Sequence, residues 1–539
     1  MRPAGLEPAT LCFEGIYSIQ LSYGRFRVRL TYLIIDCGER QLEKPKADAK
    51  IEAMQIPQEI KSVVNQLKKH HFEVYLVGGC VRDLVLDKKP HDWDVTTNAQ
   101  PKQMMDIFKD RAFLDNQFGT VTVLTKSREK SLKEVEITPY RIEGVYKDQR
   151  HPESVTFTDD LKKDLSRRDF TINAMALDIQ EDQVALIDLF QGENDLRKKL
   201  IRAVGEAPQR FAEDALRLMR AVRLATTLDF QIEKKTQAAI KKNASLLAKI
   251  SQERIRDELM KIIASPQAAQ GIETLRQLSL LHYIVPELEE GYHVSQNKHH
   301  IYDVYEHVLR SLDYAVQQKF SLPVRLAALF HDIGKPRTKQ GRGSEATFYN
   351  HEIVGAEMTR KITTRLKFSR KEAEKVIKLV RYHLFYYNVG EVGESSVRRL
   401  VRKVGREDMK ELIQLRMADR IGSGVPKAKP YKLRHLEYMV EKVSQDPISV
   451  NKLQVSGHDI MKILQIQPGP KVGQVSAILL DRMLDNPQDN QPELLKEMIK
   501  KLGKLSDKKL EKESQQAKNN VNQIKETEDI LIKEKHWVK

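Results

Sequence analysis

The sequence predicts an α+β fold in which a small head with a mixed β-sheet is followed by a mostly α-helical remainder. Short apolar runs between residues 72 and 140 are bounded by glycine and polar residues, as expected of buried strands. From about residue 211 to about residue 500, apolar residues recur at the spacing of an amphipathic helix. The composition, 40% hydrophobic and 31% charged over 539 residues, is typical of a globular protein.

The elements of the head follow from local patterns. An amphipathic stretch predicts a helix over 58–70, and FEVYLVGG predicts a buried strand over 72–79 that ends at paired glycines. Alternating apolar residues predict strands over 119–124 and 135–140, preceded by a helix over 101–110. Strands interleaved with helices in this order indicate a small mixed sheet.

The chain is long enough for several domains. Residues 1–50 show no sustained strand or helix period and lack the features of a signal peptide. Their first stretch resembles the accidental translation of a tRNA gene, so we expect the natural protein to begin at Met54. We expect six segments: a non-native or disordered extension (1–53), the head (54–195), a helical neck (196–290), a histidine-rich helical domain (291–430), a helical tail (431–505) and a charged C-terminus that is a frayed helix or disordered (506–539).

The charge balance indicates a polyanionic partner. Lys and Arg number 91 against 75 Asp and Glu, a net charge of +16, which favours nucleic acid, with a dispersed solubility charge as the alternative. Three cysteines cannot form a disulfide framework, which favours a reducing compartment, and we expect the cytoplasm. No run approaches the roughly 18 apolar residues of a membrane span, so we expect no membrane partner.

Two carboxylates in HDWDVTT (91–97) predict a metal site. Asp92 and Asp94 stand two apart on an extended segment and project from one face, where they would repel unless a cation lay between them. Hard oxygen ligands suit Mg²⁺. Glu136 on a neighbouring predicted strand is a candidate third carboxylate, although Glu134 lies on the same face of that strand. The set predicts a two-metal site for phosphoryl transfer, and the alternative is an exposed acidic pair with no ligand.

A second group of residues is suited to bind a nucleotide. Gly78 and Gly79 directly follow a strand, where the backbone can approach a ligand, and Arg82 adds a fixed positive charge for a triphosphate. In RRDFTINAMAL (167–177), polar residues interrupt an apolar run and therefore need partners. The candidates there are Arg168 for phosphate or ribose, Asn173 for a sugar or a metal-bound water, and Asp169 between them.

A predicted helix over 211–225 carries a polar stripe. Asp214, Arg217, Arg220 and Arg223 recur at every third residue, and the first two can act as one rigid pair. A carboxylate accepts from an exocyclic amino group and a guanidinium donates to a ring acceptor, a combination that selects cytosine and adenine without a template. The alternative is an ordinary salt bridge on a helix.

Over residues 70–265 the chain resembles the class II tRNA nucleotidyltransferases, the CCA-adding enzymes, and their relatives the bacterial poly(A) polymerases. The motifs that carry the resemblance are GGCVRD, HDWD, EITPYR, DLSRRDFTINAMAL, EDALRLMRAVRLA and ERIRDELMKI. The resemblance implies that Asp92 and Asp94 hold the metals, that Gly79 and Arg82 bind the triphosphate, and that Arg168, Asp169 and Asn173 bind near the ribose. It further assigns base selection to Asp214 and Arg217, nucleotide contacts to Arg220 and Arg223, and a switch from C to A to the segment 146–157, with Asp148 and Arg150.

Histidines and aspartates of the middle domain form a second set. A histidine on one such helix is more often a core residue, but nitrogen and carboxylate ligands on separate helices suit a transition-metal or mixed site. In order they resemble the ligands of the HD phosphohydrolase superfamily over 297–425, which implies hydrolysis of phosphate esters with a divalent transition metal or Mg²⁺. The alternative is a structural domain that extends an RNA-binding surface. The candidate ligands are His307, His331, Asp332, His351, His383 and Asp419.

The resemblance implies template-independent addition of CCA to tRNA 3′ ends from CTP and ATP with release of pyrophosphate. A CC-adding or A-adding half-enzyme, a poly(A) polymerase, an enzyme that is mainly a phosphohydrolase and a non-catalytic RNA-binding protein are the alternatives. In the tail, residues 455–484 resemble the tRNA-contacting end of related enzymes, and the basic cluster 427–435 is a candidate for binding tRNA phosphates or is a solvated face. The oligomeric state is not predicted.

Overall fold

The computed structural model describes residues 55–115, 118–144, 154–180, 183–297, 301–444 and 453–538, together with the backbone of 17–23 and 26–32. In the N-terminal extension β1 (Tyr17–Tyr23) pairs antiparallel with β2 (Phe26–Tyr32), whereas we expected no regular structure there. Phe26, Val28 and Leu30 alternate with polar residues, a strand pattern that the sequence analysis missed. The expected start at Met54 lies outside the described residues.

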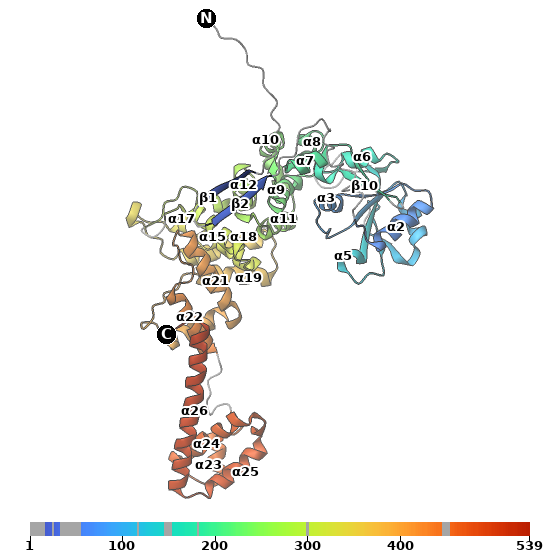
Figure 1. Cartoon of the computed structure of the whole chain (residues 1–539). Helices are drawn as coiled ribbons and strands as arrows, with labels where there is room; N and C mark the ends of the chain where they lie inside the picture. Colours follow the sequence, from blue (N-terminus) through green and yellow to red (C-terminus); the bar gives the residue numbers. More distant parts are fainter. Residues whose placement is uncertain are drawn as a thin grey trace.

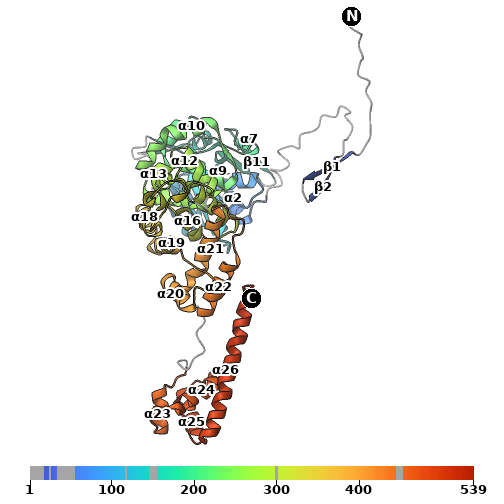
Figure 2. The same ribbon diagram turned by 90° about the vertical axis from the view of Figure 1, so that its left-hand side faces the viewer.

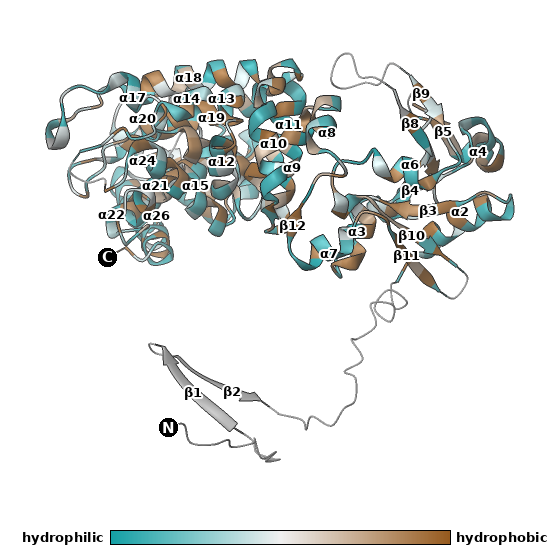
Figure 3. Cartoon of the chain, turned by 90° about the horizontal axis from the view of Figure 1, so that it is seen from above, coloured by the Kyte–Doolittle hydropathy of each residue, from teal (hydrophilic) through white to brown (hydrophobic). Residues whose placement is uncertain are grey.

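A seven-stranded mixed sheet forms the head, in the order β11-β10-β3-β4-β7-β6-β5 (Figures 1 and 3). Within it β4 and β7 are parallel and the other neighbours are antiparallel, which confirms the predicted fold class. The strands of the head are β3 (Val74–Val77), β4 (Asp94–Thr97), β5 (Ala112–Leu114), β6 (Val121–Leu124), β7 (Glu134–Pro139), β8 (Arg141–Glu143), β9 (Val155–Phe157), β10 (Met175–Ile179) and β11 (Val184–Asp188), and β12 (Leu200–Ile201) follows at the start of the neck.

Short helices connect and cover these strands. The first, α2, buries Ile60, Val63, Val64 and Leu67, which lie on one face at helical spacing, and it packs against β3 and α4. The helices of the head are α2 (Gln58–Lys69), α3 (Gly79–Val85), α4 (Pro101–Phe108), α5 (Lys130–Lys133), α6 (Leu161–Ser166) and α7 (Gly192–Arg197), with 3₁₀ turns η1 (Lys109–Arg111) and η2 (Thr171–Asn173).

The neck and the middle domain are helical, apart from β12 and β13 (Gln231–Ile232), which pair with each other. One hydrophobic core runs through the head, the neck and the middle domain, from Ile56 to Ala418. The helices of the neck are α8 (Ala207–Glu213), α9 (Leu216–Leu228), α10 (Lys234–Asn243), η3 (Ala244–Lys249), α11 (Gln252–Ala264), α12 (Ala268–Gln277), α13 (Leu281–Ile284) and α14 (Pro286–Glu289). Those of the middle domain are α15 (Val304–Gln317), α16 (Leu322–Phe330), α17 (Lys335–Thr338), η4 (Gly343–Glu345), α18 (His351–Arg365), α19 (Arg370–Tyr382), α20 (Glu394–Val404) and α21 (Arg406–Gly422).

The predicted helix over 211–225 is interrupted. α8 ends at Glu213 and α9 begins at Leu216, because Asp214 has extended backbone angles and its Oδ1 accepts the N–H of Leu216 at 3.0 Å. Asp214 therefore stands at a helix junction and does not share a continuous helical stripe with Arg217, as we had expected.

Within the tail, α23 to α26 form a helical bundle with its own core, whereas α22 packs against α20 and α21. The C-terminus, expected to be a frayed helix or disordered, is the long helix α26, which packs along α24 and reaches back to α22 (Figures 1 and 2). Leu510, Ser514, Ala517 and Val521 form a narrow buried stripe within an otherwise charged sequence, which explains why composition alone was misleading. The tail helices are α22 (Tyr431–Ser444), α23 (Gly457–Leu464), α24 (Pro470–Asp485), α25 (Pro492–Gly503) and α26 (Asp507–Lys535), with η6 (Pro487–Asp489). Within the described residues, no helix is both long and apolar enough to span a bilayer.

Candidate functional sites

The sheet of the head brings the predicted carboxylates together at one edge. Asp94 is the first residue of β4, Asp92 lies two residues before it, and the parallel register places Glu136 of β7 directly beside Asp94. Glu134 pairs with Leu124 at the other side of β7 and has no partner on β4, so the register favours Glu136 over Glu134 as the neighbour of Asp94.

The electrostatics of this edge suit a cation. Burial, followed by the charges of Asp92 and Glu136, raises the pKa of Asp94 to about 6, against the opposing influence of the Arg168 and Arg220 guanidiniums. Burial also raises the pKa of Glu136, and the next contribution comes from Asp115, a further carboxylate after β5 that the sequence analysis did not single out. A divalent cation bound here would relieve the repulsion between these carboxylates.

The carboxylate edge is open. Asp92 and Glu136 are exposed, and in the described part of the chain the three carboxylates do not form a group with all ligand atoms within 4.8 Å of one another. Asp92 and Asp94 nevertheless fit Mg²⁺, which takes one or two protein carboxylates and completes its shell with waters and substrate phosphates.

The turn between β3 and α3 requires glycine. Gly78 has φ +76°, and a Cβ there would lie 3.0 Å from Asp94 Oδ2 and 3.2 Å from Arg168 Nη1. A side chain at this position would be strained by the positive φ and would crowd two candidate site residues. Gly79, the other predicted residue, is the first residue of α3.

A chain of polar side chains links the predicted nucleotide-binding residues. Arg82 Nη1 donates to Asn173 Oδ1 at 2.9 Å, Asn173 Nδ2 donates to Asp169 Oδ1 at 3.1 Å, and Arg220 Nη2 donates to Asp169 Oδ2 at 2.6 Å. Burial of Asp169 opposes its ionisation, but the Arg220 charge together with the hydrogen bonds from Asn173 and Arg220 outweighs it and holds the pKa of Asp169 well below its usual range. Arg82 of α3, Asn173 of η2, Asp169 just before η2 and Arg220 of α9 are thus joined in one network.

Asp164 was missed by the sequence analysis. This fully buried carboxylate accepts from Arg167 Nη2 at 2.7 Å through one oxygen and from Arg168 Nη2 at 3.2 Å through the other. It thereby fixes the position of Arg168, whose charge acts on Asp94. The signal in the sequence is the spacing, because Asp164 lies three and four residues before the two arginines.

Asp214 and Arg217 do not form the helix salt bridge that was the alternative to base selection. Arg217 Nη1 lies 2.6 Å from Glu213 Oε2, and Asp214 Oδ2 lies 2.9 Å from Arg254 Nη2 on α11. Each member of the proposed base-selecting pair is therefore held by a different partner.

Arg223, the last arginine of the stripe, pairs with Glu258 of α11 through Nε and Oε2 at 2.9 Å. Asp148 and Arg150, predicted for the C-to-A switch, lie outside the described residues. The basic cluster 427–435 is partly used in folding contacts, since Lys429 pairs with Glu437 and Lys432 donates to Asn388.

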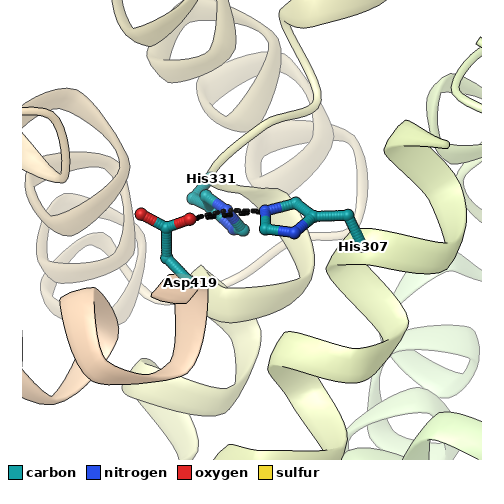
Figure 4. A group of neighbouring side chains, drawn as sticks. All are labelled: His307, His331 and Asp419. Atoms are coloured by element: carbon teal, nitrogen blue, oxygen red, sulfur yellow. Dashed lines mark hydrogen bonds and ion pairs between the residues drawn. The ribbon is translucent and has the colours of Figure 1, made fainter. Parts of the chain in front are cut away.

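The middle domain gathers all six predicted ligands from five segments. His307 comes from α15, His331 and Asp332 follow α16, His351 opens α18, His383 follows α19, and Asp419 lies on α21. His307, His331 and Asp419 form one group of ligand atoms within 4.8 Å (Figure 4), and Asp332, His351 and His383 form a second.

Asp332 lies between the two groups. Its Oδ2 is 3.0 Å from His307 Nε2 and 3.3 Å from His331 Nε2, while its Oδ1 is 3.4 Å from His351 Nε2 and 3.6 Å from His383 Nε2. The opposite ring nitrogens of three histidines contact backbone carbonyls, which orients each Nε2 inward. These Nδ1–carbonyl contacts are His331–Ala328 at 2.9 Å, His351–Phe348 at 2.7 Å and His383–Val380 at 2.7 Å.

The charges of this buried cluster suit divalent metals. Burial lowers the pKa of His331, but the Asp332 and Asp419 carboxylates outweigh it and raise the value to about 10, so a proton compensates the two acids. Those acids in turn have pKa values well below their usual range. A divalent cation would take the place of that proton, and the nitrogen and oxygen ligands are those that a transition metal accepts.

Two cationic side chains that the sequence analysis did not single out support the acids. Lys335 Nζ, which is buried, lies 2.6 Å from Asp332 Oδ2, and Arg416 Nη1 lies 2.6 Å from Asp419 Oδ2. Both stand three residues from the carboxylate that they contact, so the spacing was a usable signal. The cluster forms part of the wall of a cavity of about 630 Å³.

Comparison with known proteins agrees with this organisation. The family model "Poly A polymerase head domain" matches residues 74–202, "Probable RNA and SrmB- binding site of polymerase A" matches 229–291, and "HD domain" matches 304–423. The resemblances to the nucleotidyltransferase family and to the HD superfamily are thereby confirmed.

Individual relatives point the same way. The chain is 46% identical over 211 residues to a CCA-adding enzyme of Lactobacillus helveticus, covering 39% of this chain and 51% of the relative. It is 43% identical over 227 residues to that of Geobacillus stearothermophilus, covering 42% and 54%. The chain thus spans about half the length of the curated relatives it matches. A crystal structure of the Bacillus stearothermophilus CCA-adding enzyme in complex with CTP aligns with a TM-score of 0.55 and 27% identity, covering 83% of this chain and 98% of that one.

Proposed function

We propose that the chain adds CCA to tRNA 3′ ends, using CTP and ATP and releasing pyrophosphate. The observation that carries the proposal is the network of Arg82, Asn173, Asp169 and Arg220 beside the carboxylate edge at Asp94. The network supplies fixed positive charges and hydrogen-bond donors, and the neighbouring carboxylates would hold a metal ion. A site for a nucleoside triphosphate requires these groups. The similarity to CCA-adding enzymes supports the same conclusion.

In the proposed reaction the 3′ oxygen of tRNA bonds to the α-phosphorus of the incoming nucleotide, and the bond from that phosphorus to the bridging oxygen breaks. Mg²⁺ held by Asp92 and Asp94 would activate the 3′-hydroxyl and neutralise charge on the leaving pyrophosphate. Gly79 and Arg82 bind the triphosphate, and the glycine turn lets the backbone approach it. Catalysis is mainly positioning and charge neutralisation.

Base selection in this proposal uses Asp214 and Arg217 at the junction of α8 and α9. Because Arg254 holds the Asp214 carboxylate and Glu213 holds the Arg217 guanidinium, both groups are fixed before the base arrives. A fixed acceptor and a fixed donor discriminate against bases that present the opposite order of groups.

A lysine-rich cavity of the neck supports RNA as the partner. The cavity, about 1000 Å³, is lined by Lys198, Lys199, Lys234 and Lys241 and by one acidic residue, Asp229. None of these lysines forms an ion pair within the described ranges. Such a surface suits phosphodiester groups, and it overlaps the segment that matches the RNA-binding family model.

We further propose that the HD centre hydrolyses phosphate esters with a divalent transition metal or Mg²⁺ bound by its six ligands. The metal would supply an activated water, while Lys335 and Arg416 hold the two carboxylates and offset charge near the phosphate. We also propose the six-segment division of the chain, with its helical C-terminus, and a cytoplasmic location.

Three primers test the transfer activity: tRNA ending before CCA, tRNA ending in CC, and oligo(A), each with Mg²⁺ and labelled CTP or ATP. Ordered addition of C, C and A that then stops is the expected result. Addition of C alone, or of A alone to the CC primer, would indicate a half-enzyme, and long A tails on every primer a poly(A) polymerase. No incorporation at all would leave the HD centre as the main activity.

A further inference from the structure

Phe113 is an exposed aromatic residue on the edge strand of the head sheet. It lies at the middle of β5, the last strand of the sheet order, and 45% of its surface is exposed (Figure 3). Its neighbour Leu114 is 54% exposed. Two large apolar side chains exposed side by side on one edge are a candidate contact surface.

The strand register places Phe113 in line with the carboxylate edge. Phe113 pairs with Thr122 of β6, which pairs with Glu136 of β7, and Glu136 in turn pairs with Asp94 of β4. Paired residues of neighbouring strands share one face of the sheet, so the ring lies on the face of the two carboxylates. At the usual strand spacing, β5 lies roughly 10 Å from β7 and roughly 15 Å from β4. Leu114 faces the other side, because successive side chains of a strand alternate.

Neither folding nor strand pairing explains the ring. Among the residues that the structure describes, Phe113 belongs to none of the hydrophobic core clusters. β5 has only three residues and is flanked by Arg111 and Asp115, and short edge strands with charged neighbours resist the addition of a further strand. The ring is therefore available to a ligand on the open face of the sheet.

The charge of this face favours contact with an uncharged group of the ligand. Asp94 and Glu136 are joined by Asp115, two residues after Phe113, whose charge acts on Glu136. A cationic side chain placed here to hold an RNA phosphate would compete with a metal ion for these carboxylates. An aromatic ring instead binds a base by stacking, which adds no charge and tolerates every base.

We propose that Phe113 stacks on the 3′-terminal base of the RNA acceptor and thereby holds the attacking 3′-hydroxyl at the carboxylate edge. This inference rests on the proposed transfer function and adds the acceptor contact to it. The terminal nucleotide spans the interval between β5 and β4, with its base at the edge strand and its sugar toward Asp94. Stacking suits this acceptor because the terminal base changes after each addition. Phe113 takes no part in bond making and acts by positioning the acceptor end.

Steady-state addition of ATP to tRNA ending in CC, catalysed by the full chain, measures this contact. Phe113→Ala is expected to lower kcat/KM for the tRNA roughly tenfold, in line with the loss of one base stack. The KM for ATP should stay unchanged, because the ring contacts the acceptor and not the incoming nucleotide. Phe113→Tyr should retain wild-type kcat/KM, since stacking needs the ring.

Leu114→Ala is the matched control. Leu114 is on the same strand and is more exposed than Phe113, but it faces the other side of the sheet, so kcat/KM should not change. A tRNA whose terminal nucleotide lacks its base tests the contact without altering the protein. The wild type should lose about the same factor on this primer, and Phe113→Ala should lose little more, because both changes remove one interaction.

Unchanged kcat/KM in Phe113→Ala, or an equal loss in Leu114→Ala, would overturn the proposal. So would losses from Phe113→Ala and from the missing base that multiply, since independent effects do not share a contact. In each of these cases the wild type still adds nucleotides, and the proposed transfer function stands. If the wild type incorporates neither CTP nor ATP on any primer, the transfer function itself is wrong and this inference falls with it.

Discussion

The transfer site of the head and the HD centre both place carboxylates beside cationic side chains, yet they differ in burial. All six HD ligands are less than a tenth exposed and their ligand atoms already lie within two tight groups. In the head, Asp92 and Glu136 are exposed and the carboxylates are spread along a sheet edge. The HD cluster is therefore preassembled by its own core, whereas the proposed transfer site is open, as the proposed binding of substrate phosphates requires.

This difference predicts what substitutions will affect. Where the candidate ligands are buried and held by packed helices, metal binding depends on the local structure. Substitutions around these ligands should therefore first alter the affinity for metal. At the proposed transfer site, substitution of an open carboxylate should lower turnover while binding of the proposed tRNA partner survives. The experiments below separate these two behaviours, beginning with the largest expected effect.

The carboxylate edge should tolerate substitution structurally but not catalytically. Asp94→Asn keeps the shape and removes the charge, so we expect incorporation of CTP and ATP to fall by roughly a thousandfold or more. Gel-shift affinity for tRNA and hydrolysis at the HD centre should remain unchanged and serve as controls. Turnover close to that of the wild type would exclude Asp94 from metal binding.

The HD centre should respond through its supporting cations. Arg416→Ala removes the partner of Asp419 Oδ2, and we expect the affinity for divalent metal to fall about 10- to 100-fold, as for other residues that orient metal ligands. Arg402→Ala, an exposed arginine on the neighbouring α20, is the control. CCA addition should be unaffected in both variants. Unaltered metal affinity in Arg416→Ala would show that Asp419 needs no partner.

The junction of α8 and α9 gives a smaller effect. Arg254→Ala frees the Asp214 carboxylate, and we expect misincorporation of UTP or GTP relative to CTP to rise roughly tenfold, about the value of one hydrogen bond to a charged group. Arg256→Ala on the same helix is the control, because Arg256 pairs with Asp257 instead. If both variants select nucleotides equally well, Asp214 does not need Arg254 to read the base.

The grouping of the six candidate HD ligands could be predicted from the sequence, because each is a histidine or aspartate of a recognisable motif, although they come from separate segments. In the head, the sequence singled out most of the residues that the structure brings together, but not the partners that they contact. Sequence spacing suggested Asp214 with Arg217, but a helix break at Asp214 directs that carboxylate to Arg254, 40 residues away. A partner that comes from another element, such as Glu258 for Arg223, cannot be predicted from the spacing of residues within one segment.

The helix of the C-terminal region does not follow from its composition. Residues 506–539 are highly charged, yet α26 forms because a stripe as narrow as Leu510, Ala517 and Val521 is enough once α24 provides a matching surface. Tertiary packing thus decides a helix whose composition suggests a frayed or disordered segment. Tertiary packing also decides the burial of Asp164, which follows from the fold of the head.

The end of α26 is expected to show the weakest effect. Burial would raise the pKa of Asp529, but hydrogen bonds from Tyr438, Lys533 and Lys442 lower it to about 2. Because the folded pKa is depressed, the stabilisation is present above the unfolded value near 4 and is lost as the pH falls toward 2. Since Lys442 and Lys533 are both more than a third exposed and the cluster is screened by solvent, Asp529→Asn should cost less than about 1 kcal/mol at pH 7. Hydrogen exchange of the last turns of α26 would measure this loss of stability. At pH 7, exchange should be faster in the variant than in the wild type. After correction for intrinsic exchange, this difference should become smaller at low pH. Identical protection in both proteins at pH 7 would mean that the apolar contacts of Ile532 hold the helix end without this ionic cluster.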